Sequence, residues 1–379
     1  MKKNHGAAVL VWFLYMFLAG ILLAVCMVHV DRASEGNDLF KSPLWMLAAL
    51  AAFVLSFYLQ TIIHELGHLV FGLMTGYKFS SFRVGSFMWI KEEGKVRLKR
   101  FSIAGTGGQC IMLPPEYNDG NYKYGLYQLG GVLANVITAV ISLVLFFLTA
   151  GTAPVAIFFT GLFISGVTFA ALNGIPLNSL QVNNDGSNFV ELRKSKEARR
   201  AVWVQLAIVE GMGQNKRPRD MDQEWFRMPT EEGRKNYLAM SMAVFRENML
   251  MDAHRFEEAA DLIDELLAGD YALAAIYRQL LTCDRIYLEL IGGGDRGKVE
   301  ELCDDKQKAA MKQMAGMIYV LRTEYAYALI YENDSEKADK ILQAFEKAAA
   351  KHPYRVEVES ERELIVQAVV LARLHQSLH

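Results

Sequence analysis

The sequence predicts a mainly α-helical protein: a polytopic membrane domain of about four spans with a cytoplasmic β-hairpin, followed by a soluble α-helical domain. Two observations carry this prediction. Hydrophobic residues make up 52% of the 379 residues, which is high for a soluble protein. Almost all long uncharged runs lie before residue 185, whereas the remainder is rich in Glu, Lys, Arg and Asp. We therefore expect a membrane domain over 1–186 and a soluble domain over 187–379.

Charge and cysteine content exclude two broad classes of protein. The formal net charge of −2 and the lack of a base-reading or stacking motif argue against a nucleic-acid partner. Four cysteines, at positions 26, 110, 283 and 303, are scattered without a CxxC pair. The sequence therefore predicts reduced structural cysteines and no disulfide framework.

The first predicted span covers residues 6–30, which contain no Asp, Glu, Lys or Arg and follow Lys2 and Lys3. A cleaved signal peptide has a shorter apolar core and a small-residue cleavage site, and neither is evident here. We therefore expect a retained transmembrane helix.

Three further spans are predicted before residue 186. The second, 44–76, is too long for a perpendicular crossing, so its end should enter the cytoplasmic interface or a polar cavity. Residues 124–184 then form 61 positions without a charged side chain. This length accommodates two helices, at 125–150 and 154–177, joined by a tight turn.

Loop charges predict the orientation of the spans. Residues 78–123 contain eight Lys or Arg against four acids, and residues 31–43 contain two against three. The positive-inside rule therefore places 78–123 and the amino terminus in the cytoplasm. Four spans return the chain to the cytoplasm before residue 187. We expect an integral protein of a bacterial cell membrane whose amino terminus and carboxy-terminal domain are cytoplasmic.

Residues 82–103 have the pattern of a β-hairpin. Apolar strands at 82–90 and 96–103 flank Glu92-Glu93-Gly94, and apolar and basic residues alternate in the second strand. Two interpretations stay open at this point. The hairpin is either a solvated cytoplasmic loop or an edge strand that guides a peptide substrate.

The second span carries the motif His64-Glu65-Leu66-Gly67-His68. Its two histidines are four residues apart and share a helix face, so two imidazoles can bind one metal ion, with the Glu65 carboxylate beside them. HExxH arises by chance in roughly one chain in a hundred of this length, and the alternative is a set of polar residues facing a bundle interior. Polar groups are costly at membrane depth, by about 2.5–3.5 kcal/mol for a charge at the centre, so they need partners, and a metal supplies one.

A catalytic zinc ion takes three protein ligands and keeps one position open. Residues 124–184 contain no Asp, Glu or His, and Asp185 is the first acid after the last span. The neighbouring Gly186 lets the backbone turn tightly there. The alternative for Asp185 is a helix cap for a segment that begins near Ser187.

The chain resembles the site-2 protease family of intramembrane zinc metalloproteases over roughly residues 55–190. The resemblance rests on His64–His68 in one span and on three further segments: Gly107-Gly108, Gly131-Val132-Leu133-Ala134-Asn135, and Asn173…Pro176…Asp185-Gly186. The chain departs from the family pattern in three places. Val132 replaces a proline, the stretch from Pro176 to Asp185 is longer, and Asn184 stands where leucine is common. It therefore resembles a divergent member.

The resemblance implies a zinc ion held by His64, His68 and Asp185, with Glu65 as the general base that activates a water molecule. It also implies that Asn135 holds the substrate carbonyl or its oxyanion. The expected function is an intramembrane zinc endopeptidase that cleaves a membrane-embedded or membrane-tethered peptide. The alternative is a catalytically weak or inactive membrane scaffold whose helical domain binds a partner protein.

The soluble half is predicted to be helical and to recruit a cytosolic protein partner or regulate the membrane domain. Helical periodicity is present at 187–211, 256–263 and 336–342, with a Pro-containing linker at 216–220. Paired amphipathic helices resemble degenerate tetratricopeptide-type repeats, and a plain helical bundle is the alternative.

Overall fold

A computed structural model describes residues 43–102, 106–149, 152–176, 183–293 and 295–377, together with the single positions 20, 24 and 28. The predicted first span at 6–30 lies outside the described residues except at those single positions. The chain divides into two compact units. The first unit contains residues up to Ser86 and from Ile103 to Lys194, and the second contains Phe87–Ser102 and Ser195–His379.

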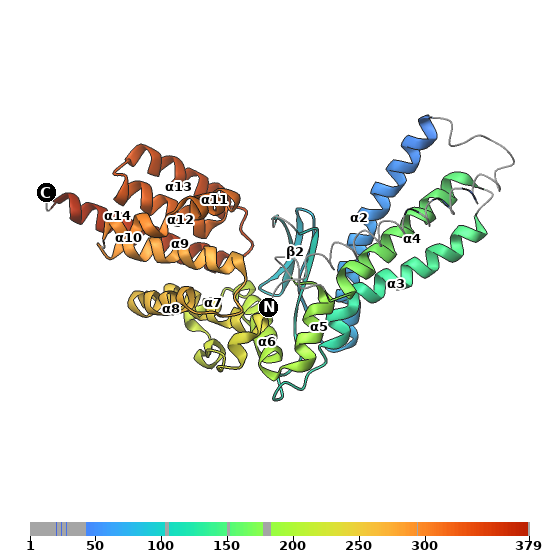
Figure 1. Ribbon diagram of the computed structural model, residues 1–379, viewed down its shortest axis with the longest axis horizontal. Coiled ribbons are helices and arrows are strands. Elements are labelled where there is room, and N and C mark those ends of the chain that lie inside the picture. The colour runs from blue at the N-terminus through green and yellow to red at the C-terminus, as the bar shows by residue number, and fades with distance from the viewer. Residues whose placement is uncertain are drawn as a thin grey trace. The chain divides into compact units, whose positions relative to one another are not determined.

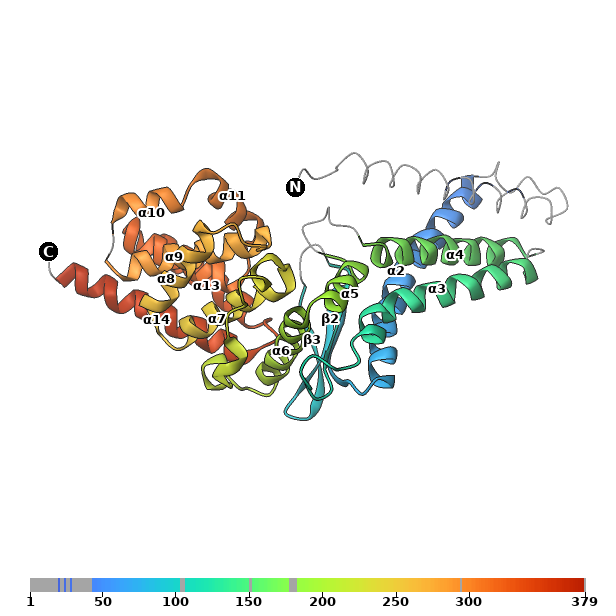
Figure 2. The ribbon, with the colours of Figure 1, turned by 60° about the horizontal axis from the view of Figure 1, so that its bottom comes forward.

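Three long apolar helices build the first unit: α2 (Pro43–Met74), α3 (Gly125–Leu148) and α4 (Ala153–Gly174). They pack on one another, and α2 crosses the other two in Figure 2. Each has the length and composition needed to cross a membrane. These helices begin and end close to the predicted bounds 44–76, 125–150 and 154–177.

The three helices expose large apolar side chains and bury several polar ones. Their exposed side chains include Val54 on α2 and Val140 and Leu148 on α3. Their buried side chains include uncharged polar ones, among them Ser142 and Thr160. The apolar exterior is unlike that of a soluble bundle and is typical of helices whose outer surface meets lipid.

Two strands and a short helix complete the first unit. Strands β1 (Lys78–Val84) and β4 (Gly108–Leu113) pair antiparallel, with Val84 opposite Gly108. Both strands pack on α2. Helix α5 (Asp185–Lys194) follows α4 and packs on α3 and α4.

The predicted hairpin exists with different bounds. Strands β2 (Phe87–Glu92) and β3 (Lys95–Arg100) pair antiparallel around Glu93-Gly94, both at positive φ, as a two-residue loop of type I′ requires. The expectation of one strand over 82–90 was wrong. Gly85 takes a φ of 57°, so β1 ends at Val84 and β2 begins after the turn.

The hairpin belongs to the second unit, where it is anchored to helices. Lys99 Nζ donates a hydrogen bond of 2.9 Å to the Pro353 carbonyl, and Asn215 Nδ2 donates one of 3.0 Å to Glu93 Oε1. The hairpin is therefore a packed part of the helical unit.

Helices form the rest of the second unit (Figure 1). They are α6 (Lys196–Gly213), α7 (Tyr237–Asp252), α8 (Phe256–Ala268), α9 (Ala275–Ile291), α10 (Arg296–Leu302), α11 (Asp305–Gln313), α12 (Ile318–Ala326), α13 (Ser335–Ala349) and α14 (Arg355–Ser377). The helical stretch predicted over 187–211 is divided between α5 and α6. Ser195 is extended there, and its side chain accepts a hydrogen bond of 3.1 Å from the Ala198 amide, which caps α6.

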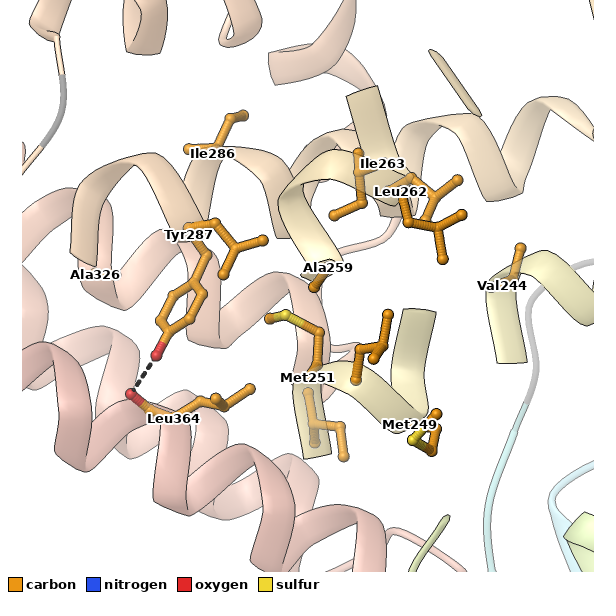
Figure 3. Packing of buried hydrophobic residues seen from close by; sticks show 14 of the residues in the cluster. Val244, Met249, Met251, Ala259, Leu262, Ile263, Ile286, Tyr287, Ala326 and Leu364 are labelled. Carbon is orange, nitrogen blue, oxygen red and sulfur yellow. Dashed lines mark hydrogen bonds between the residues drawn. The ribbon is translucent and has the colours of Figure 1, made fainter. Parts of the chain in front are cut away.

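The core of the second unit includes buried residues of α7, α8, α9, α12 and α14 (Figure 3). Met251, Ile263 and Leu364 are among its buried members, and the hydroxyl of Tyr287 donates a hydrogen bond of 2.8 Å to the Leu364 carbonyl. Burying that hydroxyl against a backbone acceptor avoids the cost of an unpaired polar group. The tetratricopeptide-like arrangement of these helices stays a prediction.

Candidate metal centre

Helix α2 presents both histidines of the HExxH motif to one point in the first unit. His64 Nε2 and His68 Nε2 lie 3.2 Å apart, as the helical spacing predicts. Asp185 Oδ2 lies 3.1 Å from the first nitrogen and 3.4 Å from the second. The potential ligand atoms of the three residues all lie within 4.8 Å of one another. The structure thus brings together the three side chains that the sequence singled out.

The contacts of Asn184 hold the start of α5 where Asp185 can face the two histidines. Its Oδ1 accepts a hydrogen bond of 3.0 Å from the Ser187 amide, so Asn184 caps α5. Its Nδ2 donates to the carbonyls of Leu172 and Ile175, both at 2.6 Å, which ties α5 to the end of α4. Because Asn184 is the cap, the Asp185 side chain points to the histidines.

Gly186 serves close packing at this junction. A Cβ on Gly186 would lie 2.1 Å from the Gly174 carbonyl oxygen at the end of α4. No side chain larger than hydrogen fits there without moving backbone. The long connection after Pro176 lies largely outside the described residues, yet the chain returns to the end of α4 at Asn184.

A close crossing of α2 and α3 carries the two histidines. A Cβ on Gly67 would lie 2.3 Å from the Gly130 carbonyl oxygen, and one on Gly131 would lie 2.5 Å from the His64 ring. Small residues at such crossings let membrane helices approach closely. Gly67 lies inside the HExxH motif, so the motif also determines how its helix packs.

The outer nitrogens of the two rings are hydrogen-bonded in a way that identifies their tautomers. His68 Nδ1 lies 2.8 Å from the Tyr127 carbonyl, which can only accept, so this nitrogen carries the proton. His64 Nδ1 lies 2.7 Å from Asn135 Oδ1, which also accepts. In the neutral form of each ring, which is the form that binds a metal, both Nε2 atoms then present lone pairs toward Asp185.

This donor set fits a metal cation. Among the described residues, Asp185 Oδ2 accepts no hydrogen bond although it is buried. With both rings neutral, two imidazole lone pairs and a buried carboxylate oxygen converge on one point, and a metal cation is a partner that satisfies all three. Nitrogen and carboxylate ligands of this kind suit zinc.

Glu65 lies against the start of β4. It is 8% exposed, and a Cβ on Gly108 would lie 2.6 Å from its Oε1. Arg83 holds this segment in place, because its guanidinium donates to the carbonyls of Gly85 and Gly108, at 2.9 and 3.2 Å, and to the Thr106 hydroxyl at 2.5 Å. The carboxylate is thus covered by an extended backbone segment.

The structure gives Asn135 a neighbour that sequence reasoning did not identify. Its Nδ2 donates to Gln60, at 2.7 Å to Oε1 and 3.1 Å to the carbonyl, while its Oδ1 faces His64. Its predicted contact with a substrate carbonyl stays a prediction. Gln60 carried one sequence signal, since it is a polar residue one helical turn before His64 in an apolar span.

A bundle of apolar helices that carries an HExxH helix and a third carboxylate defines a class of membrane-embedded metallopeptidase folds. Residues 52–358 match the family model described as Peptidase family M50. The chain therefore belongs to Peptidase family M50, the site-2 protease family. Comparison with curated proteins and with solved structures finds no match. The family and the three apolar helices together indicate a membrane protein.

Proposed function

We propose that this chain is an intramembrane zinc endopeptidase that cleaves a membrane-embedded or membrane-tethered peptide. His64, His68 and Asp185 would hold the zinc ion, and Glu65 would be the general base. One observation carries the proposal: the three ligand atoms converge, and the buried Asp185 Oδ2 accepts no hydrogen bond from the described residues. Family membership supports the peptidase chemistry.

The chemistry divides between the metal and the protein. A bound zinc ion supplies a Lewis acid that polarises a peptide carbonyl and acidifies water. Glu65, next in sequence to His64 and screened from solvent, accepts a proton and returns it to the leaving amine. Its cover at Gly108 keeps bulk water away from the carboxylate.

The edge of β4 supports a route for the substrate. A transmembrane helix hides its carbonyls in hydrogen bonds, so it must unwind before cleavage. Within the described residues, β4 pairs on one side with β1 and is the last strand in its sheet order. An unwound peptide that added to the other edge near Gly108 would pass beside Glu65. This segment replaces the 82–103 hairpin as the substrate guide that we propose.

The second unit has a separate role in this proposal. We place it, with the amino terminus, on the cytoplasmic side of a bacterial cell membrane, as the loop charges predict. There it would bind a cytosolic protein partner through 187–379. Nucleic acid has no part in the proposal.

Glu65→Gln tests the catalytic assignment. The variant should keep its zinc and lose cleavage, because the amide cannot accept the proton. Membrane proteomes of cells with wild-type protein and with Glu65→Gln should differ by an uncleaved precursor that accumulates in the variant. Full cleavage by Glu65→Gln would contradict the mechanism. A wild-type protein that holds zinc and accumulates the same precursors would instead favour a scaffold.

A further inference from the structure

We propose that Gln60 is a positioning residue of the metal centre, which sets the tautomer of His64 by orienting the amide of Asn135. The inference rests on the proposed function, since it concerns how the chain prepares His64 for a metal. Gln60 is 0% exposed on α2, one helical turn before His64. Its side-chain hydrogen bonds described below run to α3 and α4, and none of these ends on a ligand atom.

A chain of hydrogen bonds, here called the relay, runs from Leu162 through Gln60 and Asn135 to His64. It begins at a backbone carbonyl of α4. Gln60 Nε2 donates a hydrogen bond of 3.0 Å to the Leu162 carbonyl. A carbonyl oxygen can only accept, so the nitrogen of the Gln60 amide must face α4 and its oxygen must face α3. Gly166 leaves room for this nitrogen, because a Cβ there would lie 2.9 Å from it.

The second step crosses to α3. Gln60 Oε1 accepts from Asn135 Nδ2 at 2.7 Å and from the Thr138 hydroxyl at 3.3 Å. Because this oxygen has lone pairs only, Asn135 must present its nitrogen to Gln60. The oxygen of the same amide then faces the His64 ring.

The third step returns to α2. Asn135 Oδ1 lies 2.7 Å from His64 Nδ1, and since it can only accept, the proton of the ring is on Nδ1. In the neutral ring the lone pair is then on Nε2, which lies 3.1 Å from Asp185 Oδ2. A carbonyl on α4 thus determines, through two amides, which nitrogen of His64 is available to a metal ion.

The two histidines differ in the acceptor that holds the proton on Nδ1. His68 donates directly to the Tyr127 backbone carbonyl at 2.8 Å, so no side chain is involved. His64 depends on Asn135 and, behind it, on Gln60. Hydrogen-bonded partners behind a metal ligand typically contribute 10–100-fold to metal affinity. Replacing the Gln60 side chain removes the shorter of the two bonds to Asn135 Nδ2 and leaves the one of 3.1 Å to the Gln60 backbone carbonyl. The Asn135 amide is then held less firmly with its oxygen toward His64.

Zinc affinity of the full-length protein, measured by chelator competition in detergent, tests the relay. Gln60→Met should bind zinc about 10–100-fold more weakly than wild type. Asn135→Leu should show a loss at least as large. The double variant should bind no more weakly than Asn135→Leu alone, because both residues act through one chain of bonds.

Ser56→Ala is the matched control. Ser56 is buried on the same helix one turn earlier and hydrogen-bonds to Ala52 within α2 at 2.6 Å and to the Phe158 carbonyl of α4 at 3.5 Å. It has no link to His64 among these contacts, so Ser56→Ala should keep wild-type zinc affinity. If Gln60→Met does not yield folded protein, Gln60→Asn provides a smaller change, since it keeps an amide that is one methylene too short.

Two results would overturn the inference: wild-type zinc affinity in the Gln60 variants, or losses that add in the double variant as independent structural defects do. Failure of the proposed function gives a different result. In that case the wild-type protein itself would bind no stoichiometric zinc.

Discussion

Asn184 shows how one residue outside the metal ligands can determine the site. It caps α5 and bonds two carbonyls at the end of α4. These contacts place the next residue, Asp185, opposite the histidines. A leucine at this position would leave the Leu172 and Ile175 carbonyls without this donor.

We predict that Asn184→Leu weakens zinc binding by roughly tenfold, since the partners that orient a ligand are lost. The lost cap costs about 1 kcal/mol of stability in addition. Ser195→Ala is the control, because it removes the cap of α6, where the hydroxyl accepts from Ala198 at 3.1 Å, in the second unit. Equal zinc affinity in wild type and Asn184→Leu would show that Asp185 is positioned by other contacts.

At this scale the sequence could predict which side chains lie together where the pattern is local, and their roles as ligands stay predictions. His64 and His68 follow from helical spacing, and Asp185 from its being the first acid after a long uncharged run. Gln60 was missed because its importance comes from Asn135, 75 positions away in sequence. No periodicity in either helix encodes that pairing.

The crossing of α2 and α3 is the element-scale feature on which the site depends. Gly67 and Gly130 approach so closely that a Cβ on either would lie within 2.6 Å of the other's carbonyl oxygen. Backbone atoms cannot move aside as a flexible side chain can. The distance between the helices, and so the place of His64 beside Asn135, depends on these two glycines.

We predict that Gly130→Ala destabilises the bundle and lowers its zinc content. Overpacking costs about 1–3 kcal/mol, which outweighs the gain of about 1 kcal/mol from a better helix former. Gly125→Ala is the control on the same helix, because its Cβ would meet only Phe189, at 3.4 Å. Thermal unfolding in detergent and zinc content measure both. Equal behaviour of the two variants would contradict the tight crossing.

Helices and strands with a clear hydrophobic pattern could be predicted from the sequence. The residues at which they begin and end were harder to predict. The helices at 125–148 and 153–174 follow from uncharged length, and the helix at 43–74 follows from an apolar run whose only Asp, Glu, Lys or Arg is Glu65. The turn at Gly85 was missed because the residues on both sides of it have strand character. The interruption between α5 and α6 at Ser195 was not predicted. A serine is also found inside helices, and only its hydrogen bond with the Ala198 amide identifies it as a cap.

The whole molecule joins an apolar unit to a unit whose core contains charge. Arg322 is buried and pairs with Asp284 and Glu361, the latter at 3.0 Å. Glu247 lies near this group at 0% exposure, and neither of its carboxylate oxygens has a hydrogen-bond partner among the described residues. Burial, reinforced by the charge of Asp284, raises the pKa of Glu247 well above its ordinary value of 4.5.

This shift predicts how Glu247 contributes to stability. The folded protein favours the protonated carboxyl, so this contribution is complete below about pH 4.5 and is lost as the pH rises through the folded-state pKa. Glu247→Gln removes the titration. It should match wild type in acid and unfold at a higher temperature than wild type at alkaline pH.

Unfolding of the full chain, followed by circular dichroism at several pH values, measures this difference. Glu301→Gln, at an exposed position, removes a charge without burial and should leave the pH dependence unchanged. A Glu247→Gln variant that is destabilised equally at every pH would contradict the prediction.

The change of composition near residue 185 predicted that two kinds of structure follow each other. It could not predict that Phe87–Ser102 belongs with the second unit. That assignment depends on contacts such as Lys99 with the Pro353 carbonyl, which are remote in sequence. The family match over 52–358 likewise extends well beyond the motif-bearing segments.

The most direct test of the account is the zinc content of purified full-length protein, measured by elemental analysis. We predict one zinc ion per chain in wild type and in Glu65→Gln, and a large loss in His64→Ala and Asp185→Ala. The two Ala variants should unfold at a lower temperature with added zinc than wild type does, since a bound ligand stabilises the folded state. Wild-type protein without zinc, or zinc content unchanged by His64→Ala, would contradict the metal centre described above.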